Sequence, residues 1–261
     1  MSGSQQGNAD HNIDAAAVEG IVEKAHRRIA GLQKSEADLG VTNDRRQGYL
    51  VDAKDAFHAL YVLGDKKSAR VWAERGVAYA LEFFFGVWRD QVPSGNGRNQ
   101  PPNREWQDRS LNWVEPLEEA LVLATILERW DDVRRLAEFP RDDISENDGI
   151  VAVMDACWLY LCGVIRGRDP QELEPFQQRV IDQGRKRDKL FLEFVKALAR
   201  GEGVALQQAA DEYFKQFLRV ETRKDMTSFD WDGTILVHYA THLGYDLQIP
   251  EKYRKYFVTL S

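Results

Sequence analysis

The chain has 261 residues, a hydrophobic fraction of 43% and a formal net charge of -7. A chain of this size and apolar content can bury a full core without disulfides or structural metal, so the composition predicts one large domain. The acidic balance excludes the usual nucleic-acid-binding proteins, because phosphate binding needs clustered Lys and Arg.

Signals of location are few. Residues 1–13 are polar and lack the apolar centre of a signal peptide, so we expect a disordered tail there. No run of about 18 apolar residues, the length that spans a membrane, occurs in the chain. Cys157 and Cys162 share one apolar segment at a spacing that points them to different helix faces, which favours buried thiols in a reducing compartment. These features predict a cytoplasmic protein.

One unit recurs along the chain: an apolar helix, a tight tip built on Gly or Asp, and a more polar helix. The tips lie at Gly64, at Asp131 and Asp132, at Gly167 and at Gly201. Helix pairs that bury one face on the next pair form a curved bundle or a short α-solenoid. The sequence therefore predicts an all-α fold of antiparallel helix pairs, which offers binding surfaces more readily than reaction pockets.

Apolar residues at spacings of three and four predict the individual helices. The expected helices span residues 14–39, 43–63, 66–88, 133–139, 150–166, 171–183, 190–199, 205–218 and 234–243, and a further helix that ends at residue 127 begins at Trp106 or at Pro116. The segment 150–166 is apolar around most of its circumference, so we expect it at the centre of the fold. No alternating pattern of useful length indicates a strand.

Residues 91–104 interrupt the helical pattern with Pro, Gly and polar amides, which sustain neither a helix nor a strand. A loop of this length is either a joint between two halves or a functional insertion. The chain is therefore expected to form a single helical domain over residues 14–261. In an alternative interpretation, this domain consists of two fused halves, 14–90 and 105–261.

Two short motifs invite a catalytic interpretation. His238 and His242 have the spacing at which one helix face offers two nitrogens to zinc, but Tyr239 stands where zinc proteases carry Glu. We therefore expect a surface pair and no metal. Asp230 and Asp232 precede a Gly-Thr pair, and a helix start capped by one of them explains this segment better than a phosphate-transfer loop, because no buried strand precedes it.

The one basic stretch runs from Gly184 to Lys189. We interpret it as a solvated helix end, because cations are favoured near the carboxyl terminus of a helix.

Acidic residues gather around the predicted helix 133–139 and the loop that follows it. They are Asp131, Asp132, Asp142, Asp143, Glu146 and Asp148. This cluster is either a solvated face with capping acids or an electronegative patch that steers a basic protein partner. The patch is the candidate partner-binding site, and the sequence indicates no catalytic residue and no cofactor.

The end of the chain carries a family resemblance. The features that match are the opening from Phe229 to Gly233, the apolar helix through Ala240, the stop from Leu243 to Asp246, and the ending from Pro250 to Phe257. This segment resembles the carboxyl-terminal part of α-helical immunity proteins of bacterial polymorphic toxin and secreted effector systems, including the PoNi-type group that neutralises nuclease effectors. The resemblance implies an acidic cytosolic protein that binds its cognate toxin, blocks the active site and catalyses nothing itself. It transfers no interface residue, because the first 220 residues show no matching motif.

Three functions remain open at this stage. The first is an immunity protein that binds a basic toxin, and the second is a helical-repeat scaffold or adaptor for a cellular partner. The third is a metal-dependent hydrolase that uses His238 and His242. A neighbouring gene for a secreted toxin would separate the first from the second.

Overall fold

The structure is a computed structural model that describes residues 15–39, 43–85, 114–139, 150–221 and 229–260. All regular elements in these ranges are helical, and no strand occurs there, which confirms the all-α prediction. The 3-10 turn η2 (Pro170–Leu173) leads into α8. The α-helices are α1 (Ala15–Leu39), α2 (Asn43–Val62), α3 (Lys66–Phe85), α5 (Val114–Ile126), α6 (Trp130–Ala137), α7 (Ile150–Ile165), α8 (Glu174–Gln183), α9 (Lys186–Arg200), α10 (Gly203–Glu221), α11 (Trp231–His242) and α12 (Glu251–Arg254).

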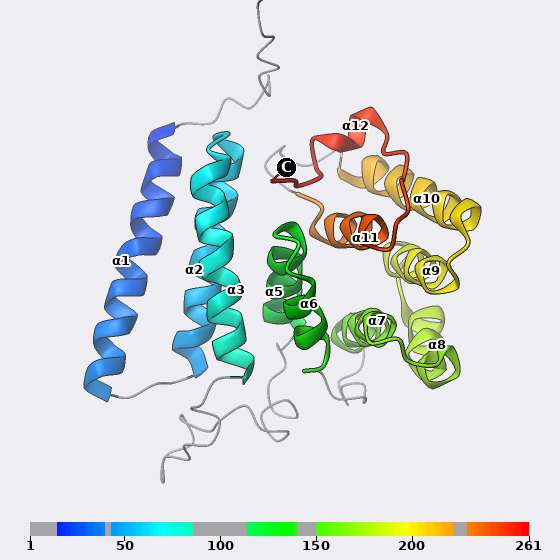
Figure 1. Cartoon of the computed structure of the whole chain (residues 1–261), viewed down its shortest axis with the longest axis horizontal. Helices are drawn as coiled ribbons and strands as arrows, with labels where there is room; N and C mark the ends of the chain where they lie inside the picture. The colour runs from blue at the N-terminus through cyan, green and yellow to red at the C-terminus, as the bar shows by residue number, and fades with distance from the viewer. Residues whose placement is uncertain (1–14, 40–42, 86–113, 140–149, 222–228, 261) are drawn as a thin grey trace, which may run out of the picture.

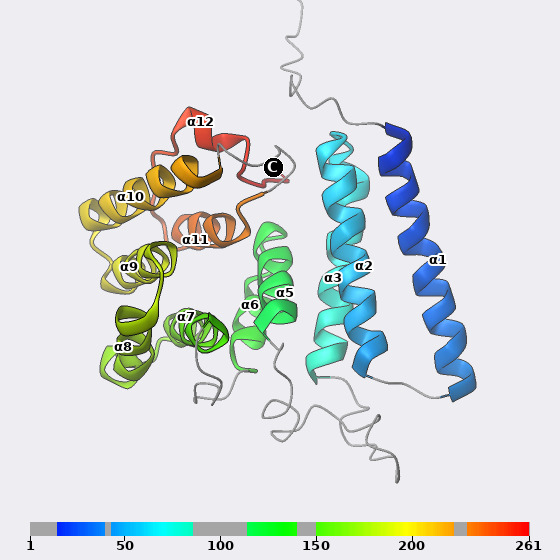
Figure 2. The ribbon, with the colours of Figure 1, turned by 180° about the vertical axis from the view of Figure 1, so that it is seen from behind.

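From α1 to α10, consecutive helices pack as neighbours. Helices α1, α2 and α3 lie side by side in both views (Figures 1 and 2), and α7 with α8 and α9 with α10 form further contacting pairs. In the view of Figure 1, α1 to α3 run in the plane of the picture, whereas α7, α9 and α11 are seen nearly end-on. The molecule therefore consists of two groups of helices whose axes run in different directions.

The tips between helices have the expected backbone. Gly64, Gly167 and Gly201 all adopt positive φ, which glycine reaches without steric cost. At the remaining tip Glu128 takes this conformation with φ of 58°, and the Arg129 N–H closes the turn on the carbonyl of Ala124 at 2.9 Å. The tip that the sequence places at Asp131 and Asp132 therefore lies a few residues earlier, because α6 already begins at Trp130.

Helix α5 joins the two groups. Eleven of its 13 residues are buried, and it contacts α2 and α3 on one side and α7 and α11 on the other. Pro116 lies in its first turn, as expected. Helix α7 is also largely buried, as its sequence predicts, but its Met154 side chain is 36% exposed. Both helices are therefore buried over most of their described length, with α5 at the junction of the two groups and α7 packed against α5, α6, α8 and α9.

The basic stretch from Gly184 to Lys189 requires a correction. Gly184 follows the last turn of α8, and Lys186 opens α9, so these cations lie at a helix amino terminus. The helix dipole disfavours cations there. Asp188 compensates, since its carboxylate accepts a hydrogen bond from the Arg185 N–H at 2.7 Å.

Candidate functional site

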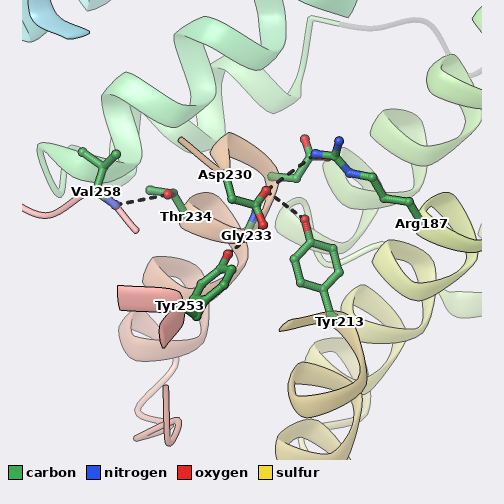
Figure 3. A network of polar contacts seen from close by, with 8 residues as sticks. Arg187, Tyr213, Asp230, Gly233, Thr234, Tyr253 and Val258 are labelled. Carbon is green, nitrogen blue, oxygen red and sulfur yellow. Dashed lines mark hydrogen bonds and ion pairs between the residues drawn. The ribbon is translucent and has the colours of Figure 1, made fainter. Parts of the chain in front are cut away.

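The acid that opens α11 is the centre of a buried polar network. Asp230 is fully buried and caps the helix by accepting a hydrogen bond from the Gly233 N–H at 3.1 Å. The same carboxylate accepts one hydrogen bond from the Tyr213 hydroxyl of α10 at 3.0 Å and another from the Tyr253 hydroxyl of α12 at 2.7 Å. Figure 3 shows both tyrosines converging on Asp230. The capping role that the sequence predicts for this segment is therefore confirmed.

A guanidinium group completes the network. Arg187, in the first turn of α9, donates from Nη2 to Asp232 Oδ2 at 2.8 Å, and the same Nη2 lies 3.6 Å from Asp230 Oδ1 (Figure 3). Its side chain is about half exposed, whereas Asp230 has no exposed surface. Arg187 therefore links solvent to a buried carboxylate and ties α9 to the start of α11.

Gly233 is required by this crowding. A Cβ atom at this position would lie 1.9 Å from the Tyr253 hydroxyl and 2.7 Å from Asp230 Oδ2. Any side chain here would displace the tyrosine from the carboxylate. The residue is glycine because the hydrogen-bonded hydroxyl occupies the space that a Cβ would fill.

The end of the chain is held against the same point. The Asp230 N–H donates to the carbonyl of Tyr256 at 3.0 Å, and the Val258 N–H lies 3.4 Å from its acceptor, the Thr234 hydroxyl. Tyr253 and Tyr256 are both buried. The motifs of the family resemblance, at Phe229 to Gly233 and at Pro250 to Phe257, thus meet in one structural unit.

Burial sets the ionisation of these groups. It raises the pKa of Asp230 to about 6, with a further contribution from the charge of Asp232 and opposition from Arg187. The pKa of Asp232 is raised by burial as well, again opposed by Arg187. Burial and the nearby Asp230 charge also raise the pKa of the Tyr213 and Tyr253 phenols, so both stay protonated and act as donors.

A cavity of about 540 Å³ opens beside the network. It lies among α7, α10 and the start of α9, and α5 and α11 each contribute one residue. Three acids and three cations line it, namely Glu118, Asp188, Asp232, Arg185, Lys186 and Arg187, and its aromatic groups are Trp158, Phe191, Tyr213 and Phe217. The cavity therefore combines aromatic and charged side chains that are held on five helices.

Two adjacent carboxyls of α5 extend the polar groups towards α2. Glu119 is buried and pairs through Oε1 with Lys54 of α2, while its Oε2 has no hydrogen-bond partner among the described residues. Glu118 faces the cavity. Burial raises the pKa of Glu118 well above its ordinary value, and the charge of Asp232 raises it further. Carboxyls of α5 and α11 thus meet where the two groups of helices join.

The two thiols are buried and unlinked, as expected. Burial raises the pKa of Cys162 to about 12 and raises that of Cys157 as well, although Cys157 reaches the cavity wall. A thiol in this environment stays protonated and is a poor nucleophile.

The structure tests only part of the acidic patch. Asp131 is exposed at the start of α6, whereas Asp132 is partly buried and pairs with Arg129 at 2.5 Å. Asp142, Asp143, Glu146 and Asp148 lie outside the described residues, as do the loop 91–104 and the tail 1–13. The assignment of this patch as a partner-binding surface stays a prediction.

Both histidines of the zinc-like spacing have other contacts. His238 Nε2 lies 2.8 Å from the carbonyl oxygen of Val258, and its ring stacks on Phe257. The His242 ring stacks on Trp130 with centroids 3.9 Å apart. The part of the chain that the structure describes holds no group of three residues suited to a metal ion.

Several residues of the network carry no signal in the sequence. These residues are Glu118, Arg187 and Tyr213, which lie in three different helices. The sequence around each of them is typical of an ordinary surface or core position of a helix. The resemblance groups Tyr253 with the Phe229 to Gly233 segment, and this was the one available indication that the two segments act together.

Comparison with known proteins gives no match: no family model, curated protein or solved structure aligns with the chain. Among the helices of the described ranges, none combines the length and apolar character needed to cross a lipid bilayer.

Proposed function

We propose that this protein is an immunity protein that binds a basic toxin domain in the cytoplasm and blocks it by direct contact, without a reaction of its own. The observation that carries the proposal is the charge imbalance at the junction of the two helix groups. Four carboxyls gather there, those of Glu118, Glu119, Asp230 and Asp232, against two cations, Lys54 and Arg187. Carboxyls that outnumber their cations at a junction between helices suit a cationic partner.

The chemistry of the site favours binding over reaction. The carboxylate of Asp230 is occupied by two tyrosine hydroxyls and a backbone N–H, and the Cys157 thiol is held protonated by burial. Groups committed to hydrogen bonds within the fold are poorly placed to act as a general base or a nucleophile.

The acidic patch provides a second element of the proposal. Asp131 and its neighbours in the acidic patch would act at the rim, where charge raises the association rate more than it strengthens the final complex. Attraction of this kind extends about 8 Å at physiological salt, so association should slow as salt is raised.

The direct test is co-expression with a toxin encoded beside this gene. Wild-type protein should rescue growth and co-purify with the toxin. Replacing Asp131, Asp132, Asp142 and Asp143 by Asn should leave folding intact, slow association at low salt and weaken rescue. Unchanged association at low and at high salt would remove the patch from the interface. Lack of rescue and of co-purification by the wild type would overturn the proposal in favour of a scaffold for another partner.

A further inference from the structure

We infer that the carboxyl group of Glu118 receives a lysine or arginine side chain of the partner protein, inserted into the cavity among α7, α9 and α10. This inference rests on the proposed function for the identity of the partner as a protein, but the recognition of a cation by the cavity stands on the geometry alone.

Among the acids that line the cavity, Glu118 is the one with neither an ion pair nor a hydrogen-bond donor in the described part of the chain. Arg187 is taken up by Asp232 at 2.8 Å and lies 3.6 Å from Asp230, while Lys54 is paired with Glu119. Within the described ranges, the Glu118 carboxyl makes no hydrogen bond and no ion pair. A desolvated carboxyl without a donor is unfavourable unless it is protonated or meets a cation.

The walls suit the rest of a basic side chain. Trp158, Phe191 and Phe217 provide aromatic surface on which the methylene stem of Lys or Arg can pack, and rings of this kind also attract a cation. The volume of about 540 Å³ leaves room for the side chain and for part of the backbone that carries it. The occupant is therefore an amphipathic cation and not a bare metal ion.

Cations at the rim of the cavity do not reverse its preference for a cationic side chain. Arg185 and Lys186 also border the cavity, but both are exposed, so water screens their charges. Asp188, partly buried, lies beside them at the start of α9. An anion entering the cavity would leave these screened cations and approach the unpaired carboxyl of Glu118.

Binding should release a proton. The groups that influence the Glu118 carboxyl are Asp232 and Arg187 across the cavity, Glu119 on its own helix and Lys54 of α2, and the cavity wall adds Asp188 of α9, Cys157 of α7 and Tyr213 of α10. Because the pKa of Glu118 is raised in the free protein, an arriving cation stabilises the carboxylate and expels the proton. Affinity for the cation should therefore rise with pH until Glu118 is ionised in the free protein.

The test uses full-length protein and two small probes, N-acetyl-arginine amide and its uncharged isostere N-acetyl-citrulline amide. Calorimetry, repeated in buffers of different ionisation enthalpy, gives both the affinity and the protons released. The arginine probe should bind about tenfold more tightly than the citrulline probe, a ratio that corresponds to one charge-assisted contact. Glu118→Gln should abolish this ratio and the proton release.

Glu115→Gln is the matched control, because Glu115 is an exposed acid of the same helix and should leave both quantities unchanged. Met154→Lys is a second variant that places a cation at the cavity wall and should exclude the arginine probe even if Glu118→Gln fails to fold. Equal binding of the two probes, or preferential binding of N-acetyl-aspartate amide, would overturn the inference. Probe binding without toxin rescue would refute only the proposed function, and rescue by Glu118→Gln equal to wild type without probe binding would refute only this inference.

Discussion

Helices α1 to α3 and helices α9 to α12 hold together by different means. Helices α2 and α3 bury several small residues, Ala53, Ala56, Ala69 and Ala73, and a Cβ on Gly76 of α3 would lie 3.6 Å from Ala53 of α2 and 2.6 Å from Leu123 of α5. The carboxyl-terminal helices use large aromatic side chains, such as Phe214 and Tyr253 with ring centroids 4.3 Å apart, around the buried acid Asp230. The first region has a close approach at Gly76 and an apolar interior, whereas the second depends on a buried network in which every donor needs its acceptor.

The two regions even use the same helix cap differently. Asp65 caps α3 in solvent by accepting a hydrogen bond from the Ser68 N–H at 3.0 Å, and its pKa is lowered by hydrogen bonds from Ser68. Asp230 caps α11 inside the protein, and its pKa is raised by burial. One residue type in one local role therefore has opposite electrostatic consequences, and the predictions below test how far this difference extends.

The largest effect is expected from Asp230→Ala. This change leaves two buried tyrosine hydroxyls and the Gly233 N–H without an acceptor, so the free energy of unfolding should fall by about 3 to 5 kcal/mol. Urea denaturation at neutral pH measures it. Asp65→Ala is the comparison and should have a clearly smaller effect, because water replaces the carboxylate there. Equal losses from the two variants would show that the network adds nothing beyond capping.

Gly233→Ala should be the next most damaging change. The added methyl group would overlap the Tyr253 hydroxyl and push it away from Asp230, which combines overpacking with a lost buried hydrogen bond, and we expect a loss of about 3 kcal/mol. Thermal unfolding followed by circular dichroism checks it. A variant as stable as wild type would mean that Tyr253 is not held against Asp230.

Stability should depend on pH in an unusual direction. Because the pKa of Asp230 is raised from 3.8 to about 6, its contribution to stability is fully present below the pKa of the unfolded chain and is lost as pH rises through about 6. Raising the pH from 4 to 7 should therefore remove up to about 3 kcal/mol from this group. Denaturant titrations at several pH values should show the decline in wild type and a flatter profile in Asp230→Asn. Asp65→Asn should retain the wild-type decline between pH 5 and 7, because the lowered pKa of Asp65 places its titration below this range.

The smallest expected effect is a gain in stability. Gly31 lies inside α1 with open space where a Cβ would stand, so Gly31→Ala should stabilise the protein by about 0.5 to 1 kcal/mol through helix propensity. The same thermal assay that detects the loss in Gly233→Ala should detect this gain. A loss of stability in Gly31→Ala would mean that the outer face of α1 is covered by a partner or by another part of the chain.

The sequence by itself determined the helices and their tips. Apolar spacing and a capping residue act within a few positions of the chain, so segments such as 15–39 and the glycine tip at Gly64 were predictable without the fold. The cap formed by Asp230 and the burial of both thiols followed from the same local patterns. The apolar pattern predicts a start at residue 190 for α9, whereas the helix begins at Lys186, because its first turn is charged and carries no apolar residue before Leu190.

Only the tertiary structure decided which polar groups meet. Arg187 and Asp232 are 45 positions apart and come together because α9 packs on α11, and Glu118 joins them through α5. The pKa of a carboxyl depends on its desolvation and on charges from other helices, neither of which spacing along the chain encodes. The periodicity of apolar residues indicates which face of each helix is buried. Only the packing of the helices brings the capping acid Asp230, the half-exposed Arg187 and the unpaired Glu118 into a single site.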